Sequence, residues 1–174
     1  MAVTISGSTP TFSAATGYAG GVVTNGTTVA TTSGTAIDLS TSIPSWVKRI
    51  TVMFNGISVS GTSTILLQIG SGSYTTTGYS ASTVQIPAGG SGTATAGFPS
   101  LNTGATNTYS GLYTIATLGS NIWVGSATIG LDGNTYTVQS TGRITLGGTL
   151  DRIRITTVNG TDTFDAGSIN ILYE

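Results

Sequence analysis

Apolar and polar residues alternate along most of this chain, in short stretches bounded by turn-forming residues. In residues 49–54, Ile50, Val52 and Phe54 fall on one face, and residues 64–69 repeat the pattern. A period of two is typical of a half-buried strand, whereas no stretch repeats its apolar residues at three and four over several helical turns. We therefore predict strands at residues 49–54, 64–69, 112–118, 122–129, 143–146, 150–158 and 169–173.

The residues between these stretches predict how the strands connect. Gly119-Ser120-Asn121 separates two apolar stretches and predicts an antiparallel pair, and Asn55-Gly56 predicts a turn after the first strand. About eight short strands without crossover helices are typical of an antiparallel sandwich. The predicted fold class is all-β, with a jelly roll as the first choice of sandwich and an immunoglobulin-like sandwich as the alternative.

Two regions depart from the regular strand pattern. Residues 1–34 carry few apolar side chains for a core of their own, and we predict an extended N-terminal arm there, followed by one sandwich domain at 35–174. Residues 71–111 are rich in Gly, Ser and Thr and are expected to form long loops. Tyr74, Tyr79 and Tyr109 in this region are the candidate ligand or receptor contacts, because loops on a rigid scaffold often carry binding sites.

The low charge of the chain points to assembly. Charged residues make up only 6% of the 174 residues, and the net charge is −1. A lone copy therefore has little charge repulsion to keep it soluble, which favours a larger assembly. A pI near 5.0 with only five basic residues predicts no nucleic-acid partner. The lack of a long apolar run predicts no membrane partner and no secretion signal.

The composition also limits the available chemistry. The chain has no His and no Cys, which excludes Ser-His-Asp triads, thiolate nucleophiles and most zinc or haem sites. Asp162 and Asp165 are the only close carboxylate pair, and we interpret them as turn formers. No dense Asp spacing supports calcium. We predict no catalytic residue, no cofactor and no metal, so a carbohydrate-active enzyme of jelly-roll form is a remote third hypothesis.

The two tryptophans of the chain have different expected positions. Trp46 lies beside Lys48 and Arg49 and could stack on a ligand, but we expect it to close the end of the sandwich because large aromatic side chains are mostly buried. Trp123 lies inside an apolar stretch. We predict that it belongs to the core or to a subunit interface.

Two stretches resemble a family. Residues 43–56, Ile-Pro-Ser-Trp-Val-Lys-Arg-Ile-Thr-Val-Met-Phe-Asn-Gly, and the terminal residues 148–174 look like a module of tail-fibre-like proteins of tailed bacteriophages. The resemblance covers roughly residues 35–174. It implies a homotrimeric β-sandwich on the virion surface, assembled in the host cytoplasm, and it supplies no catalytic residues. Unlike a typical tail fibre, the chain has no long repetitive shaft.

Two functions follow as hypotheses. The first is a homotrimeric tail-fibre or receptor-binding module whose loops at 71–111 contact a host surface glycan. The alternative is a capsid decoration (cement) protein that stabilises the phage head, with the arm reaching a neighbouring protein. In both, the partners are further copies of the chain and other virion proteins.

Overall fold

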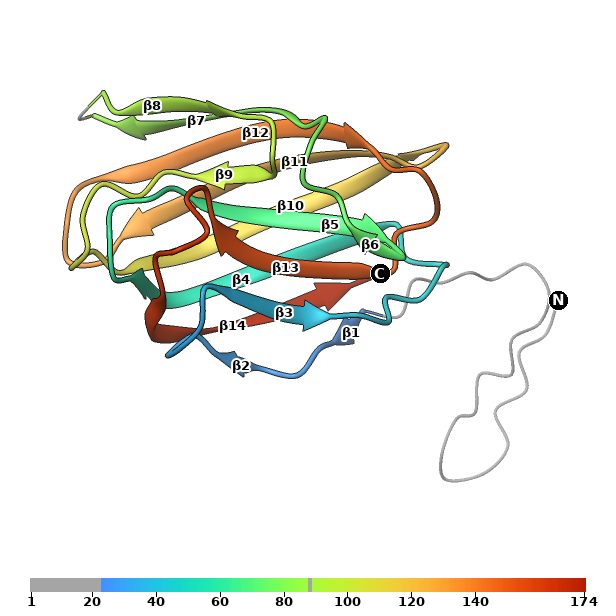
Figure 1. The fold of residues 1–174 in the computed structure, drawn as a ribbon, viewed down its shortest axis with the longest axis horizontal. Helices are drawn as coiled ribbons and strands as arrows, with labels where there is room; N and C mark the ends of the chain where they lie inside the picture. The colour runs from blue at the N-terminus through green and yellow to red at the C-terminus, as the bar shows by residue number, and fades with distance from the viewer. Residues whose placement is uncertain (1–22, 88) are drawn as a thin grey trace, which may run out of the picture.

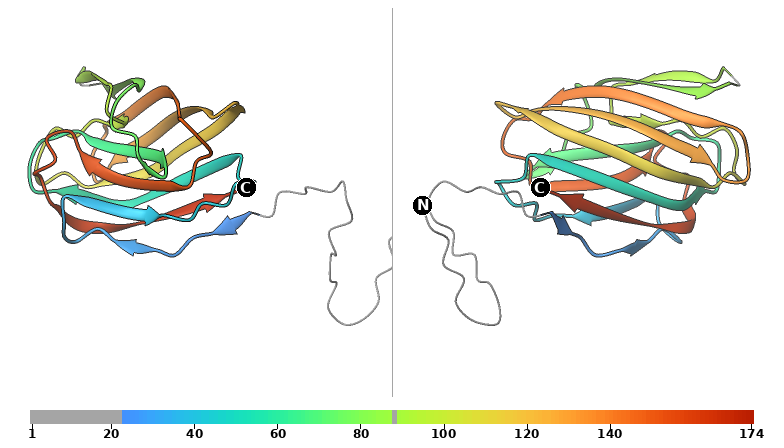
Figure 2. Two further views of the ribbon diagram at one scale, coloured as in Figure 1. Left: turned by 45° about the vertical axis from the view of Figure 1, so that its right-hand side comes forward. Right: turned by 180° about the vertical axis from the view of Figure 1, so that it is seen from behind.

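The computed structural model describes residues 23–87 and 89–174 as two antiparallel sheets packed face to face (Figures 1 and 2). This confirms the predicted all-β sandwich. The larger sheet has nine strands and the smaller has five. A jelly roll has eight strands arranged as two Greek keys, so the broader name, antiparallel sandwich, describes these unequal sheets.

The nine-stranded sheet contains the long strands of the molecule. Its order is β1-β14-β4-β10-β11-β12-β7-β8, with β2 also paired to β14. The consecutive strands β10, β11 and β12 form an up-and-down meander, and the predicted turn at residues 119–121 joins the first two. The bounds in sheet order are β1 Thr24–Asn25, β2 Val29–Ala30, β14 Phe164–Tyr173, β4 Arg49–Val59, β10 Tyr109–Gly119, β11 Ile122–Leu131, β12 Thr137–Thr145, β7 Ser80–Ile86 and β8 Ser91–Ala94.

The five-stranded sheet covers one face of the larger one. Its order is β3-β13-β5-β6, and β9 also pairs with β5. The bounds are β3 Ala36–Ser40, β13 Arg152–Thr157, β5 Ile65–Ser71, β6 Ser73–Tyr74 and β9 Phe98–Ser100.

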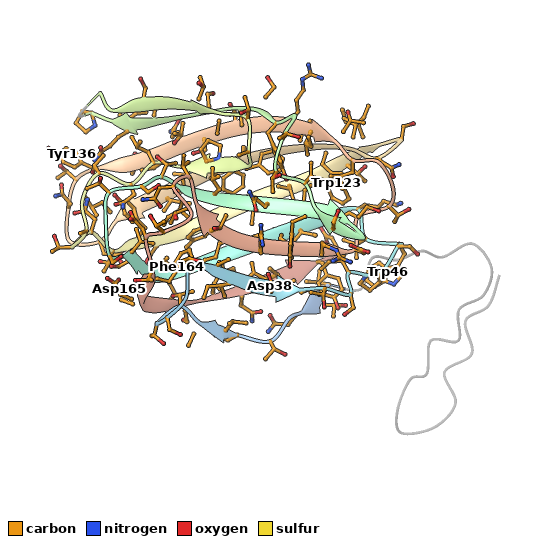
Figure 3. The ribbon with its side chains drawn as sticks, viewed as in Figure 1. Asp38, Trp46, Trp123, Tyr136, Phe164 and Asp165 are labelled. Carbon is orange, nitrogen blue, oxygen red and sulfur yellow. The ribbon has the colours of Figure 1, made fainter. Side chains whose placement is uncertain are left out.

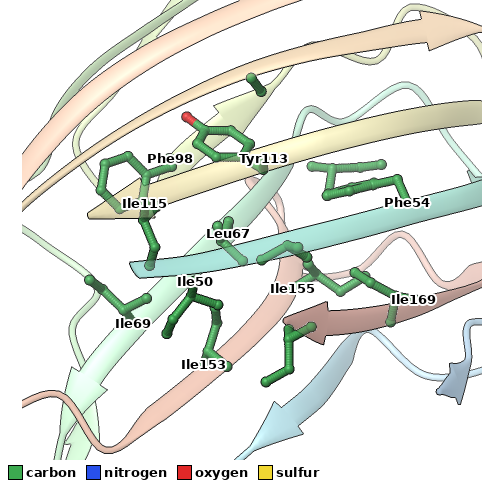
Figure 4. Close-up of a cluster of buried hydrophobic side chains, with 14 of the residues drawn as sticks. Ile50, Phe54, Leu67, Ile69, Phe98, Tyr113, Ile115, Ile153, Ile155 and Ile169 are labelled. Carbon is green, nitrogen blue, oxygen red and sulfur yellow. The ribbon is translucent and has the colours of Figure 1, made fainter. Parts of the chain in front are cut away.

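The core lies between the sheets and is built by the alternation seen in the sequence. Ile153 and Ile155 of β13 point inward with Ile50 of β4, and all three are fully buried (Figure 4). Burying one such side chain contributes about 1.5–3 kcal/mol relative to leaving it exposed. The alternating residues between them point to the outer faces, so the outer faces hold the polar groups available to other molecules.

Phe98 occupies a niche that glycines open in the larger sheet. A Cβ atom at Gly142 would lie 2.9 Å from Cδ1 of Phe98, and one at Gly125 would lie 3.4 Å from its Cε1. The ring packs edge-on against Tyr79, with 5.2 Å between ring centroids, and 5.8 Å from Tyr113. This aromatic cluster anchors residues 98–100 between the sheets.

The prediction of long loops at 71–111 is wrong for much of that region. It contains β6, β7, β8, β9 and the start of β10. In β7 the inward positions are Ala81, Thr83 and Gln85, which are buried although none is a large apolar residue. Strand β7 pairs along its length with β12, so pairing rather than apolar alternation defines it.

The described part of the predicted arm also belongs to the sandwich. Strands β1 and β2 pair with β14 at the edge of the larger sheet. Thr31 is fully buried, and its hydroxyl donates to the carbonyl of Ala166 at 2.7 Å. Residues 24–31 therefore pack on the sandwich instead of extending away from it as an arm would, and residues 1–22 lie outside the described part of the chain.

The predicted turn at Asn55-Gly56 is replaced by an irregularity within β4. The strand continues to Val59 because Ile57 and Val59 restore a buried face beyond the glycine. Gly56 has a φ of 62°, and its amide donates to the hydroxyl of Ser110 at 2.9 Å. The register of β4 against both β10 and β14 shifts next to this point, as expected for a β-bulge.

Candidate functional site

The expected surface position of two candidate tyrosines is wrong. Tyr79 is 3% exposed, and its hydroxyl accepts from the amide of Ile69 and donates to the carbonyl of the same residue. Tyr109 is 1% exposed, and its hydroxyl donates to Oδ1 of Asn102 at 3.2 Å. Both side chains hold the core and the adjacent loop together, so neither presents a ring to solvent.

Tyr74 does lie at the surface, in a cluster on the outer face of the five-stranded sheet. It is half-buried at the end of β6. The Cζ atom of Arg154 lies 4.2 Å from the centroid of its ring, and that of Arg152 lies 5.8 Å away. Both arginines come from β13, two residues apart, which places them on one face of the strand. We call Asp38, Gln68, Tyr74, Asp151, Arg152 and Arg154 the Tyr74 cluster.

A chain of hydrogen bonds fixes Arg154 within this cluster. Its Nε donates to Oε1 of Gln68 at 2.8 Å, and Nε2 of Gln68 donates to the carbonyl of Ala96 at 2.7 Å. Gln68 is 4% exposed. The guanidinium of Arg154 is therefore held at Nε by the buried amide of Gln68 and lies over the ring of Tyr74.

The cluster concentrates the charge of a nearly uncharged chain. Two of the five basic side chains of the protein and two of its six acidic side chains lie here. Nε of Arg152 donates to Asp151 at 2.7 Å, and the amide of Gly72 donates to the same carboxylate. The hydrogen bond from Arg152 lowers the pKa of Asp151 the most, and the hydrogen bond from Gly72 lowers it by a smaller amount. Asp38 faces Arg154 in the strand register, but the two form no ion pair within the described ranges.

The tyrosine hydroxyls differ in what surrounds them. Burial, and then the neighbouring carboxylate of Asp38, raise the pKa of Tyr74 well above its ordinary value. Its oxygen is buried and forms no hydrogen bond of ordinary geometry with the described residues. Burial raises the pKa of Tyr79 to about 12. All of these hydroxyls therefore stay protonated at neutral pH.

The outer face of the nine-stranded sheet is chemically different. A row of Ser and Thr residues crosses six neighbouring strands in direct register, each exposed or half-buried and none of them charged. Only one pair in the row, Ser82 and Thr141, is hydrogen bonded, at 3.3 Å. The members, in order from β8 to β4, are Thr93, Ser82, Thr141, Ser126, Thr114 and Thr51. We call this row, with the surface directly along it, the neutral face; Arg143, two residues from Thr141 on β12, is exposed beside it.

Two shallow hollows lie along the neutral face. Both are lined by Gln139, Ser140 and Thr141 of β12, so they adjoin along that strand. Val84 lines the first and Leu112 the second, and these apolar side chains are 37% and 52% exposed. A surface of hydroxyls with scattered exposed apolar groups suits contact with another uncharged surface.

The remaining candidates have mixed outcomes. Trp46 is 49% exposed at one end of the sandwich, so the prediction that it is buried there is wrong, although its ring lies 5.8 Å from that of Tyr173 (Figure 3). Trp123 is 4% exposed, which confirms its place in the core.

Asp162 accepts from the amide of Ser63 at 3.0 Å and from Asn159, as a turn former should. Asp165 lies in β14 and accepts from the hydroxyl of Ser58.

Sequence reasoning missed Arg152 and Arg154 as site residues. Their alternation with Ile153 and Ile155 was evident and placed both arginines on the face away from the core. The sequence did not show that Tyr74 lies beside these arginines. Its ring is brought to them by the pairing of β5 with both β6 and β13.

Comparisons with protein-family models, with curated proteins and with solved structures find no match for this chain. Within residues 23–87 and 89–174, no group of three or more acidic side chains is placed to hold a metal ion. No helix in the same ranges is long and apolar enough to cross a membrane.

Proposed function

We propose that the chain is a non-enzymatic structural protein of a tailed bacteriophage virion, a homotrimeric tail-fibre or receptor-binding module. The residues at 43–56 and 148–174, which resemble such modules, lie in the sandwich itself, in β4, β13, β14 and the segments that flank them. In this proposal the fold is a rigid support, and function comes from contact through its outer faces.

The observation that carries the proposal is the neutral face. Six strands present uncharged hydroxyls in one row, and exposed Leu112 and Val84 flank it. The row itself carries no charge, so two copies can bring it together without repulsion along it, and the flanking apolar groups gain from removal of water. We assign this face to contact between the three copies.

The alternative is a capsid decoration protein that uses the same face against the shell of the head. One described feature weighs against the arm-based form of that role. Residues 24–30, which the arm would include, pair with β14 of the same chain. They are therefore occupied at the edge of their own sheet.

Two measurements test the proposal. The purified chain should sediment with a mass three times its 17.4 kDa, and a mass of one copy at every concentration would contradict the trimer. Antibody labelling of intact particles should mark the tail tip. Labelling confined to the head would replace the tail-fibre function with the capsid decoration function.

A further inference from the structure

The Tyr74 cluster contains a guanidinium whose position is fixed but whose outer donors are unused. Arg154 has five N–H groups, and only Nε has a hydrogen-bond partner among the residues that the structure describes. The two terminal nitrogens make neither a hydrogen bond nor an ion pair there. Arginine presents these nitrogens as a planar fork that matches the two oxygens of a carboxylate.

Preorganisation distinguishes Arg154 from the other basic side chains. The Gln68 amide and the Tyr74 ring hold it before any ligand arrives, so little side-chain entropy is lost on binding. Arg152 is already paired with Asp151, and Arg49 with Glu174. Arg143 is exposed on the opposite sheet and has no partner in the described ranges, which makes it a matched control.

The neighbouring charges set a limit on affinity. Asp151 is neutralised by Arg152, but Asp38 is exposed and lies opposite Arg154 on the adjacent strand. Its negative charge opposes an incoming anion, although solvent screens it. Removal of this charge should therefore strengthen the binding of an anion to Arg154.

Hydroxyls around the cluster indicate what carries the carboxylate. Thr76 and Thr77 follow Tyr74 closely in the sequence and are exposed, and their side chains form no hydrogen bond with the described residues. Uncharged hydroxyl groups of this kind pair with the hydroxyls of a sugar, and they offer no apolar pocket for a peptide side chain.

We infer that the Tyr74 cluster binds a carboxylate-bearing sugar, with the terminal nitrogens of Arg154 on the carboxylate and Tyr74 as the support of that arginine. This rests on the proposed function, because it names the class of surface glycan that a receptor-binding module would contact. It replaces the three-tyrosine contact with Arg154 and the one tyrosine that supports it.

Calorimetric titration with trigalacturonate and, separately, with N-acetylneuraminate tests the inference and tells a uronate from a sialate. At least one acid should bind, and the neutral galactotriose should not. Arg154→Gln should weaken binding about tenfold or more, because a charged hydrogen-bonded contact is lost. Tyr74→Phe should retain binding, and Asp38→Asn should tighten it.

Arg143→Gln is the matched control and should bind as the wild type does. Circular dichroism and the sedimentation mass of each variant show whether the fold and the assembly persist. Equal binding by Arg154→Gln and wild type, or no binding of either acid, would overturn the inference while leaving the proposed trimer intact. Equally tight binding of trialanine, through its free carboxylate, would overturn the assignment to a sugar.

Discussion

The two outer faces of the sandwich are built from the same alternating strands, yet they differ in how their polar groups are satisfied. On the five-stranded sheet, Gln68 and Arg154 bond to each other in a network that is partly buried. On the neutral face, most hydroxyls of the row have no partner within the described chain. The first face is held by its own contacts, whereas the second has its bonding capacity left for another molecule.

The largest difference in the free energy of unfolding should appear between alanine substitutions of two glutamines, one on each face. Gln68→Ala leaves the Nε of Arg154 and the carbonyl of Ala96 without partners, and should lower the free energy of unfolding by about 1–3 kcal/mol. Gln139→Ala, at an exposed position in both hollows, should change it by less than about 0.5 kcal/mol. Urea unfolding of the two variants measures this, and equal losses would contradict the contrast between the faces.

A smaller difference is expected between neighbours on β12. Ser140 is 2% exposed, and its hydroxyl donates to Thr83 at 2.8 Å, whereas Thr141 is on the neutral face. Ser140→Ala should cost about 1 kcal/mol, and Thr141→Ser should be close to neutral. Thermal unfolding compares them. A larger loss for Thr141→Ser would mean that the row contributes to the stability of the single chain.

Alkaline pH should weaken the fold through its buried tyrosines. The pKa of Tyr79 is raised to about 12 from an ordinary value near 10. The folded state therefore holds this proton more tightly, so its contribution is fully present below pH 10 and is lost as pH rises toward 12. Stability measured across that window should fall less steeply for Tyr79→Phe than for wild type. Identical slopes would contradict the burial of this hydroxyl.

The smallest effect should come from the exposed pair of Asp151 and Arg152. The pKa of Asp151 is lowered in the folded chain, so its contribution is present above the ordinary carboxyl pKa and is lost as the pH falls below it. Solvent and salt screen such a pair. The melting temperature of Asp151→Asn should match wild type near pH 3 and lie slightly below it at pH 6. A gap that widens toward low pH would have the wrong sign.

Local patterns in the sequence predicted the parts of the fold that depend on local chemistry. The strands at 112–118 and 122–129 and the turn between them are found as expected, because apolar alternation and a turn with positive φ at Ser120 and Asn121 are local features. The strand β7 was missed because its buried positions are Ala, Thr and Gln. Its inward face is determined by pairing with a distant strand.

The candidate site was predicted only in part for the same reason. Tyr74, Tyr79 and Tyr109 have similar neighbours in sequence, all rich in Ser, Thr and Gly. Their exposure differs because Phe98 covers Tyr79 and the loop at Asn102 covers Tyr109. Tyr74 instead lies against two arginines that are distant from it in the sequence. Contacts between distant segments decide exposure, and alternation alone does not show them.

Self-association through the neutral face is the central claim, and sedimentation of two matched variants tests it most directly. Leu112 lies on that face, and Val158, which is 60% exposed, lies in the loop that follows β13. Wild type and Val158→Arg should sediment as trimers, while Leu112→Arg should sediment as a folded single copy because it places a charge at the contact. A trimer that survives Leu112→Arg would contradict the claim.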